Sequence, residues 1–235
     1  MLLRSGQVIG PLFPLPEGAI THSTQEDTPM TETDQPQIYL VTPPAFDPDP
    51  FAQQLAAVLD QTPVACLRLA LATQDVDSLS RAADQIREIA HSRDIPLVIE
   101  AHVQLVEGLG LDGVHLTDAS RSVRATRKTL GADAIIGAFC GISNHDGIGA
   151  GEAGADYIGF GPAGATVLGD GSQADYDLFA WWSEMIELPV VAEGALTPEL
   201  VALLAPVTDF FAIGQEIWSK DDPAAALLAL IQPLR

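Results

Sequence analysis

The stretch DYIGFGPAGATVLGDG, residues 156–171, sets the pattern from which the fold is predicted. A short apolar run ends in Gly-Pro, and a loop of small residues follows that carries one Thr and one Asp. Runs that are apolar throughout are typical of parallel strands buried on both faces. The pattern recurs along the chain, and candidate strands cover residues 37–42, 64–69, 96–101, 113–116, 134–139, 157–161, 189–194 and 209–214.

Helical segments separate these strands. Thr197-Pro198 and Asp222-Pro223 each supply an N-cap residue and a first-turn proline, and residues 77–93 have apolar positions at helical spacing. Strict alternation of strand and helix over roughly 200 residues predicts an α/β fold, a closed (β/α)8 TIM barrel, for residues 37–235. A doubly wound open sheet is the main rival, but its first turn usually carries a Gly-rich fingerprint, and TPPAFDPDP (residues 42–50) contains no glycine.

The first 36 residues have a different character. They show no apolar period and are rich in Thr, Pro, Gly and acidic residues, which predicts a mobile N-terminal arm over residues 1–36. The opening segment MLLRSGQVIGPLFPLPEGAI is broken by Gly and Pro and lacks the continuous apolar block of a signal peptide. Met30 offers an alternative translation start, so whether residues 1–29 belong to the natural protein is left open.

Composition limits the class of partner. Among 235 residues, 11 are Lys or Arg and 32 are Asp or Glu, giving a net charge of −21. This charge argues against a nucleic-acid or anionic-membrane partner, since both require a basic face. No apolar run is long enough for a transmembrane helix. Cys66 and Cys140 lie in apolar runs, which indicates buried reduced thiols and a cytoplasmic protein.

In a barrel, chemistry takes place where each strand meets the following helix. Arg68 at such a strand end would need an anionic partner if buried. One residue separates Glu100 from His102, so in extended chain both would face one side, as an acid–base pair or a structural pair. His145 would suit proton transfer. Further candidates at strand ends are Asp118, Cys140, Glu193, Gln215 and Glu216, while His115 lies within a strand.

Four segments in order resemble a known family: GLGLDGVHL (108–116), GADAIIGAF (131–139), EAGADYIGFGP (152–162) and LPVVAEGALTPE (188–199). Over residues 37–219 the chain resembles thiamine phosphate synthase and its thiazole tautomerase relatives. The resemblance implies a TIM barrel in thiamine biosynthesis. It also implies a transferase that joins a pyrimidine diphosphate to a thiazole phosphate with the help of Mg²⁺ and releases diphosphate.

Several positions depart from the family pattern. Arg68 and Thr166 match, whereas the two positions at which the family holds Mg²⁺ with Asp are Ala101 and Ser120. The other replaced positions, which in the family contact diphosphate or phosphate, are Cys66, Ala70, Leu168, Gly169, Ala195 and Gln215. A diphosphate is held by Mg²⁺ and by Lys or Arg, so we expect Mg²⁺-dependent coupling to be impaired. No cofactor is expected unless Glu100 and Asp118 rebuild a cation site.

A monophosphate needs fewer contacts. Backbone N–H groups can hold it, and barrels commonly bind phosphate after strands seven and eight. The expected partner is therefore a small phosphorylated heterocycle such as thiazole phosphate; homo-oligomerisation is left open. Three functions remain: a divergent synthase-family protein, a metal-free tautomerase-like isomerase, and a non-catalytic homologue that binds a ligand or partner. The expected phosphate-binding residues are Gly161, Thr166, Gly194, Ala195, Gly214 and Gln215.

Overall fold

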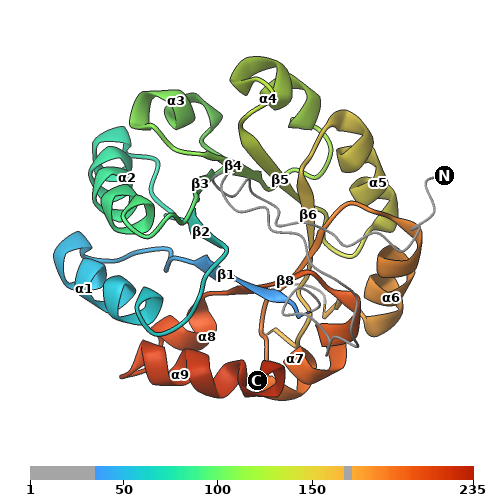
Figure 1. Ribbon diagram of the computed structural model, residues 1–235. Coiled ribbons are helices and arrows are strands. Elements are labelled where there is room, and N and C mark those ends of the chain that lie inside the picture. The colour runs from blue at the N-terminus through green and yellow to red at the C-terminus, as the bar shows by residue number, and fades with distance from the viewer. Residues whose placement is uncertain (1–34, 167–170) are drawn as a thin grey trace, which may run out of the picture.

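Eight parallel strands form a closed barrel in the computed structural model, which describes residues 35–166 and 171–235. Each strand pairs with the next in chain order, and β1 pairs with β8, with Gln37 opposite Phe210, to close the ring (Figure 1). The strands are β1 (Gln37–Val41), β2 (Cys66–Leu69), β3 (Leu97–Glu100), β4 (Gly113–Leu116), β5 (Ile135–Phe139), β6 (Tyr157–Phe160), β7 (Val190–Glu193) and β8 (Phe210–Ile213).

Helices surround the barrel as an outer ring (Figure 1). The α-helices are α1 (Pro48–Leu59), α2 (Val76–His91), α3 (Val106–Leu109), α4 (Val123–Leu130), α5 (Asn144–Ala153), α6 (Tyr176–Met185), α7 (Pro198–Leu204), α8 (Gln215–Trp218) and α9 (Pro223–Leu230). Short 3-10 turns are η2 (Val103–Leu105), η3 (Ala205–Val207) and η4 (Gln232–Leu234). Within the two described ranges, no helix is long and apolar enough to cross a membrane.

The predicted barrel and all eight predicted strands are confirmed, and the open sheet is wrong. The N-cap predictions also hold: Thr197 Oγ1 accepts from Leu200 N at 3.3 Å, and Asp222 Oδ1 accepts from Ala225 N at 3.0 Å. The helix predicted over residues 77–93 is α2, which ends two residues earlier, at His91. The predicted arm stays a prediction, because residues 1–34 lie outside the described residues.

Alternation along each strand divides the barrel wall into two faces. One face packs against the helices with aliphatic side chains such as Leu40, Leu67 and Ile99. The other face encloses a smaller apolar cluster made of Tyr39, Cys66, Val98, Tyr157, Val191, Phe210 and Ala212. The inward-facing polar residues Arg68, Glu100 and His115 lie next to this inner apolar cluster.

Helix α8 is fastened to the barrel by an indole. Trp218 Nε1 donates a hydrogen bond of 2.6 Å to the carbonyl oxygen of Val41 at the end of β1. The Trp218 ring also packs edge-on against Phe51 of α1, with ring centroids 4.9 Å apart. These contacts fix the segment that follows β8.

Candidate functional site

A single guanidinium lies inside the barrel, between two carboxylates. Arg68 of β2 is only 6% exposed, and it is the only Lys or Arg on the eight described strands. Its Nη2 lies 3.0 Å from Oε2 of Glu193 at the end of β7, and its Nε lies 3.6 Å from Oε2 of Glu100 at the end of β3. Burial favours the neutral form of Arg68, but its surroundings outweigh this effect and raise its pKa, Glu193 most, followed by Tyr39, Tyr157 and Glu100. The anionic partner predicted for Arg68 is thus supplied by the chain itself.

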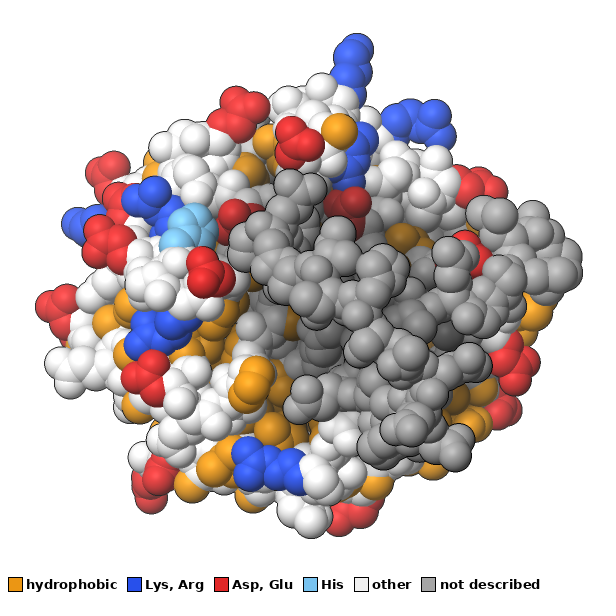
Figure 2. Space-filling view, viewed as in Figure 1, with side chains coloured by type: hydrophobic (Ala, Val, Ile, Leu, Met, Phe, Trp, Pro, Cys, Tyr) orange, Lys and Arg blue, Asp and Glu red, His pale blue; other side chains and the backbone are white. Residues whose placement is uncertain are grey.

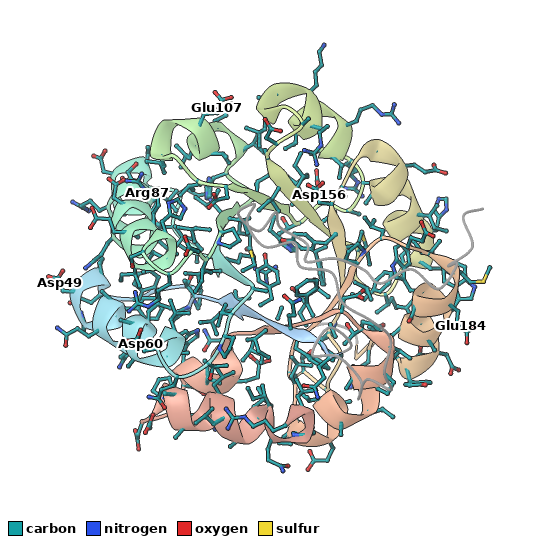
Figure 3. The ribbon with its side chains drawn as sticks, viewed as in Figure 1. Asp49, Asp60, Arg87, Glu107, Asp156 and Glu184 are labelled. Atoms are coloured by element: carbon teal, nitrogen blue, oxygen red, sulfur yellow. The ribbon has the colours of Figure 1, made fainter. Side chains whose placement is uncertain are left out.

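Several other charged side chains of the described residues point to solvent. Figure 3 shows Asp49, Glu107 and Glu184 projecting outward from the ring of helices. Arg68 instead has two buried N–H groups, on Nε and Nη1, that make no hydrogen bond within the described residues. Its guanidinium carbon also lies 5.6 Å from the ring centroid of Tyr39, a cation–π distance.

Three polar rings, those of Tyr39, Tyr157 and His115, are hydrogen-bonded in series inside the barrel, and Tyr39 lies beside the guanidinium of Arg68. The hydroxyls of Tyr39 and Tyr157 share a hydrogen bond of 2.6 Å, and the Tyr157 hydroxyl lies 3.0 Å from His115 Nδ1. Burial lowers the pKa of His115 well below its usual range, and the charge of Arg68 adds to the effect. His115 is therefore a neutral imidazole, and its buried Nε2 has no hydrogen-bond partner in the described part of the chain.

Two glycines make room for these rings. A methyl group on Gly137 would lie 2.0 Å from Tyr157 Cζ, so Tyr157 occupies its position because residue 137 has no side chain. A methyl group on Gly159 would lie 3.8 Å from both Glu193 Oε2 and His115 Cε1. The position over Gly159 is thus surrounded by the Phe139 ring, whose Cδ2 would be nearest at 3.5 Å, by the Glu193 carboxylate and by the Cε1 edge of the His115 imidazole.

Three strand ends carry left-handed alanines. The φ angles are 61° at Ala101 after β3, 59° at Ala119 after β4, and 53° at Ala195 after β7. Such angles are unfavourable for residues with a Cβ, and they turn the chain sharply out of each strand. The left-handed Ala101 contradicts the expectation that Glu100 and His102 form a same-side pair, because that expectation required extended chain.

Glu216 joins the loops that follow β7 and β8. Its Oε2 accepts a hydrogen bond of 2.9 Å from Gly214 N, and its Oε1 accepts one of 3.2 Å from Leu196 N. One donor lies beyond β7 and the other at the end of β8. The amide of Gly214, expected to bind phosphate, is thus already engaged by a carboxylate of the chain.

The second proposed cation ligand, Asp118, is bonded through one carboxylate oxygen only, because its buried Oδ1 has no hydrogen-bond partner in the described residues. Asp118 Oδ2 accepts a hydrogen bond of 2.5 Å from Ser122 Oγ within its own loop. No group of three or more His, Cys, Asp or Glu side chains in residues 35–166 and 171–235 is arranged to hold a metal ion. The two positions at which the resemblance places Mg²⁺ ligands, Ala101 and Ser120, carry no carboxylate, so any Mg²⁺ would have to use Glu100 or Asp118.

Comparison with known proteins assigns this barrel to a family. The family model described as thiamine monophosphate synthase matches residues 38–217, which is most of the chain. The chain belongs to the thiamine monophosphate synthase family.

Relatives and solved structures agree with this assignment. The thiamine-phosphate synthase of Rhodospirillum centenum is 39% identical over 194 residues, covering 81% of this chain and 94% of that protein. The thiamine-phosphate synthase of Erythrobacter litoralis is 34% identical, covering 83% and 95%. The solved thiamine phosphate pyrophosphorylase of Pyrococcus furiosus has a TM-score of 0.73 at 19% identity, covering 84% and 95%, and shows the shared fold.

Within this member of the thiamine monophosphate synthase family, the predicted site residues do not all meet. Arg68 and Glu100 do, and Glu193 joins them. His145 is exposed in the first turn of α5, and Gln215 is exposed at the start of α8. Its neighbour Glu216 is the side chain that bonds to Leu196 N and Gly214 N. Gly161 is buried, Gly194 and His102 are half-buried, and Thr166 is exposed, while Leu168 and Gly169 lie outside the described residues.

The cysteines behave as predicted. Both are buried free thiols, and burial raises the pKa of each, to about 12 for Cys140. Cys140 Sγ lies 3.6 Å from the carbonyl oxygen of Ala138 and is core packing rather than a nucleophile.

Tyr39 and Tyr157 were missed as site residues. The alternation of side chains along each strand could have identified them. Inward positions on successive strands are occupied by Tyr39, Arg68, Glu100 and His115. An inward polar residue on a strand buried on both faces is a site candidate even when it precedes the strand end.

Proposed function

We propose that this protein binds a heterocyclic intermediate of thiamine biosynthesis in the barrel mouth and that Mg²⁺-dependent diphosphate coupling is impaired. The observation that carries the proposal is the internal neutralisation of Arg68. A synthase needs its guanidinium for the departing diphosphate, yet here Glu193 and Glu100 already face it. Figure 2 shows Asp and Glu side chains together with Lys and Arg on the described part of this face, and the net charge of −21 repels a polyanion.

The loss of rate should be large. Neutralising developing charge in the transition state is usually the largest catalytic contribution, and one lost contact of this kind costs about 3 kcal/mol, or a hundredfold or more. Two independent losses would leave about one part in ten thousand of the ordinary rate.

The test is thiamine phosphate formation by the purified protein from pyrimidine diphosphate and thiazole phosphate with Mg²⁺, beside an ordinary synthase. We expect no turnover or turnover at least about a thousandfold lower. A rate within tenfold of the ordinary synthase, abolished by Arg68→Ala, would restore the coupling reaction. Titration calorimetry with thiamine and with thiamine phosphate separately tests whether the protein binds such a heterocycle.

The space over Gly159 favours a second function, a metal-free isomerase that works by proton transfer. The base would be Glu193, whose Oε2 lies beside this position and also faces Arg68, with the Phe139 ring and the Cε1 edge of the neutral His115 imidazole alongside. Such an enzyme should exchange ligand protons with deuterium from solvent. Exchange that is lost in Glu193→Gln supports the isomerase, and absence of exchange in the unmodified protein rules against it.

A further inference from the structure

The loops after β7 and β8 of a (β/α)8 barrel, with a short extra helix, frequently form a phosphate site. Here the short helix is α8, Leu196 lies in the loop after β7, and Gly214 lies directly after β8. The backbone amides of both residues donate to Glu216, one to each carboxylate oxygen, at 3.2 and 2.9 Å. A carboxylate that accepts backbone N–H bonds in this way makes charge-assisted contacts of the kind a phosphate would make.

We propose that Glu216 acts as a built-in anion in this position and makes the barrel selective for an unphosphorylated, neutral or cationic nitrogen heterocycle. The inference rests on the proposed function for the ligand class and narrows it. It replaces the expectation of a phosphorylated ligand, because a phosphate monoester would have to expel Glu216 from both amides.

Charge in the barrel points the same way. Arg68, the one Lys or Arg on the described strands, faces Glu100 and Glu193, so with Glu216 one guanidinium is set against three carboxylates. A phosphate entering near these carboxylates meets repulsion, which in a partly buried site is screened less than at the surface. A thiazolium or aminopyrimidine ring instead meets acceptors that suit its charge and N–H groups.

A helix-capping role for Glu216 explains only one of its two hydrogen bonds to backbone amides. Glu216 is the second residue of α8, and its bond to Gly214 N is a local cap of that helix. Its bond to Leu196 N crosses to the loop after β7, twenty residues away. Replacing a purely structural residue would change only the stability of the protein. Replacing a residue that sets ligand selectivity also changes the ratio of the affinities for thiamine and thiamine phosphate.

The experiment compares thiamine with thiamine phosphate, which differ only in the phosphate, by calorimetry on the full chain. The unmodified protein should bind thiamine at least about tenfold more tightly than thiamine phosphate. In Glu216→Ala the affinity for thiamine phosphate should rise about tenfold or more while that for thiamine stays constant. Glu184→Ala, which removes the same charge from the exposed outer face of α6, should leave the ratio unchanged.

A second experiment uses inorganic phosphate, so its result does not depend on binding of the heterocycle. Millimolar phosphate should raise the melting temperature of Glu216→Ala and leave that of the unmodified protein unchanged, because a ligand of the native state stabilises it. Glu216→Gln, which keeps the size and an acceptor oxygen, serves if the alanine variant does not fold.

The outcomes separate the two proposals. If neither thiamine nor thiamine phosphate binds, the proposed function fails, and the phosphate arm alone decides the role of Glu216. Tighter binding of thiamine phosphate to the unmodified protein overturns the inference and leaves the proposed function standing. Absence of a phosphate shift in every folded Glu216 variant also overturns it.

Discussion

Arg68 and Glu193 form an ion pair with 3.0 Å between Nη2 and Oε2, and the two side chains come from β2 and β7. The strands that carry them are not neighbours in the barrel, so the pair spans the interior. Both side chains are largely removed from solvent, with 7% and 18% of their surface exposed. A charge buried this way is costly once its partner is gone.

Removing the guanidinium should therefore unfold the protein more readily. Arg68→Met leaves Glu193 and Glu100 uncompensated, and we expect a loss of about 3–5 kcal/mol in the free energy of unfolding. In Arg68→Met with Glu193→Gln, part of that loss should return. Urea titration at neutral pH measures both. The matched control is Arg93→Met, which breaks an exposed pair with Asp60 and should cost less than about 1 kcal/mol. Equal losses in the two single variants would contradict the burial argument.

His115 should make stability depend on pH. Its pKa is lowered in the folded protein, so below about pH 6.5, the usual pKa of an unfolded histidine, only the unfolded chain takes up the proton. Stability from this residue is thus complete above that pH and declines on acidification, by up to about 1.4 kcal/mol per pH unit, until the folded pKa is reached.

His115→Asn removes this titration and keeps a polar group near Tyr157. Denaturation series between neutral and mildly acid pH should show a flatter slope for His115→Asn than for the unmodified protein. His145→Gln, at an exposed position on α5, is the control and should keep the original slope. Parallel slopes for the unmodified protein and His115→Asn would show that the imidazole is not held neutral.

Gly137→Ala tests the packing of Tyr157. The added methyl group would overlap a ring that is fixed by Tyr39 and His115, so we expect a loss of about 2 kcal/mol or more. Gly108→Ala, on α3 with no atom within 4 Å of the new methyl group, should instead be neutral or stabilising by about 0.5–1 kcal/mol. Thermal unfolding of the Gly137→Ala and Gly108→Ala variants measures both effects. A small loss of stability in Gly137→Ala would mean that Tyr157 can move aside.

Magnesium should not stabilise the protein. A cation that binds the native state raises the melting temperature. Ala101 and Ser120 carry no carboxylate, and Glu100 and Glu193 face Arg68. We therefore expect identical melting curves with EDTA and with millimolar Mg²⁺. A rise that disappears in Glu100→Gln or Asp118→Asn would show a rebuilt cation site.

The sequence was sufficient for the barrel because each strand carries its own local signal. Runs such as residues 134–139 are apolar throughout and are followed by helix caps, and these features do not depend on distant contacts. The need of Arg68 for an anionic partner followed from its place at a strand end, but which carboxylates would supply it, Glu193 and Glu100, did not. The bond from Leu196 N to Glu216 could not be predicted, because it depends on how two loops twenty residues apart come together.

Local exceptions also limited the site prediction. The positive φ of Ala101 removed the extended geometry on which the Glu100–His102 pair rested, and nothing in the residue type announces it. Tyr39 and Tyr157 look like ordinary core aromatics until the barrel closes and brings their hydroxyls within 2.6 Å. Side-chain networks across a barrel are long-range in sequence, so local patterns do not encode them.

The anchoring of α8 by Trp218 gives the protein an intrinsic optical reporter. The indole is hydrogen-bonded to Val41 O and lies two residues from Glu216, so a ligand that expels this carboxylate disturbs the same short helix. Emission from Trp218 alone can be followed in a Trp181→Phe, Trp182→Phe background, in which no other tryptophan remains. Occupancy of the β7–β8 position can thus be titrated by fluorescence without any label.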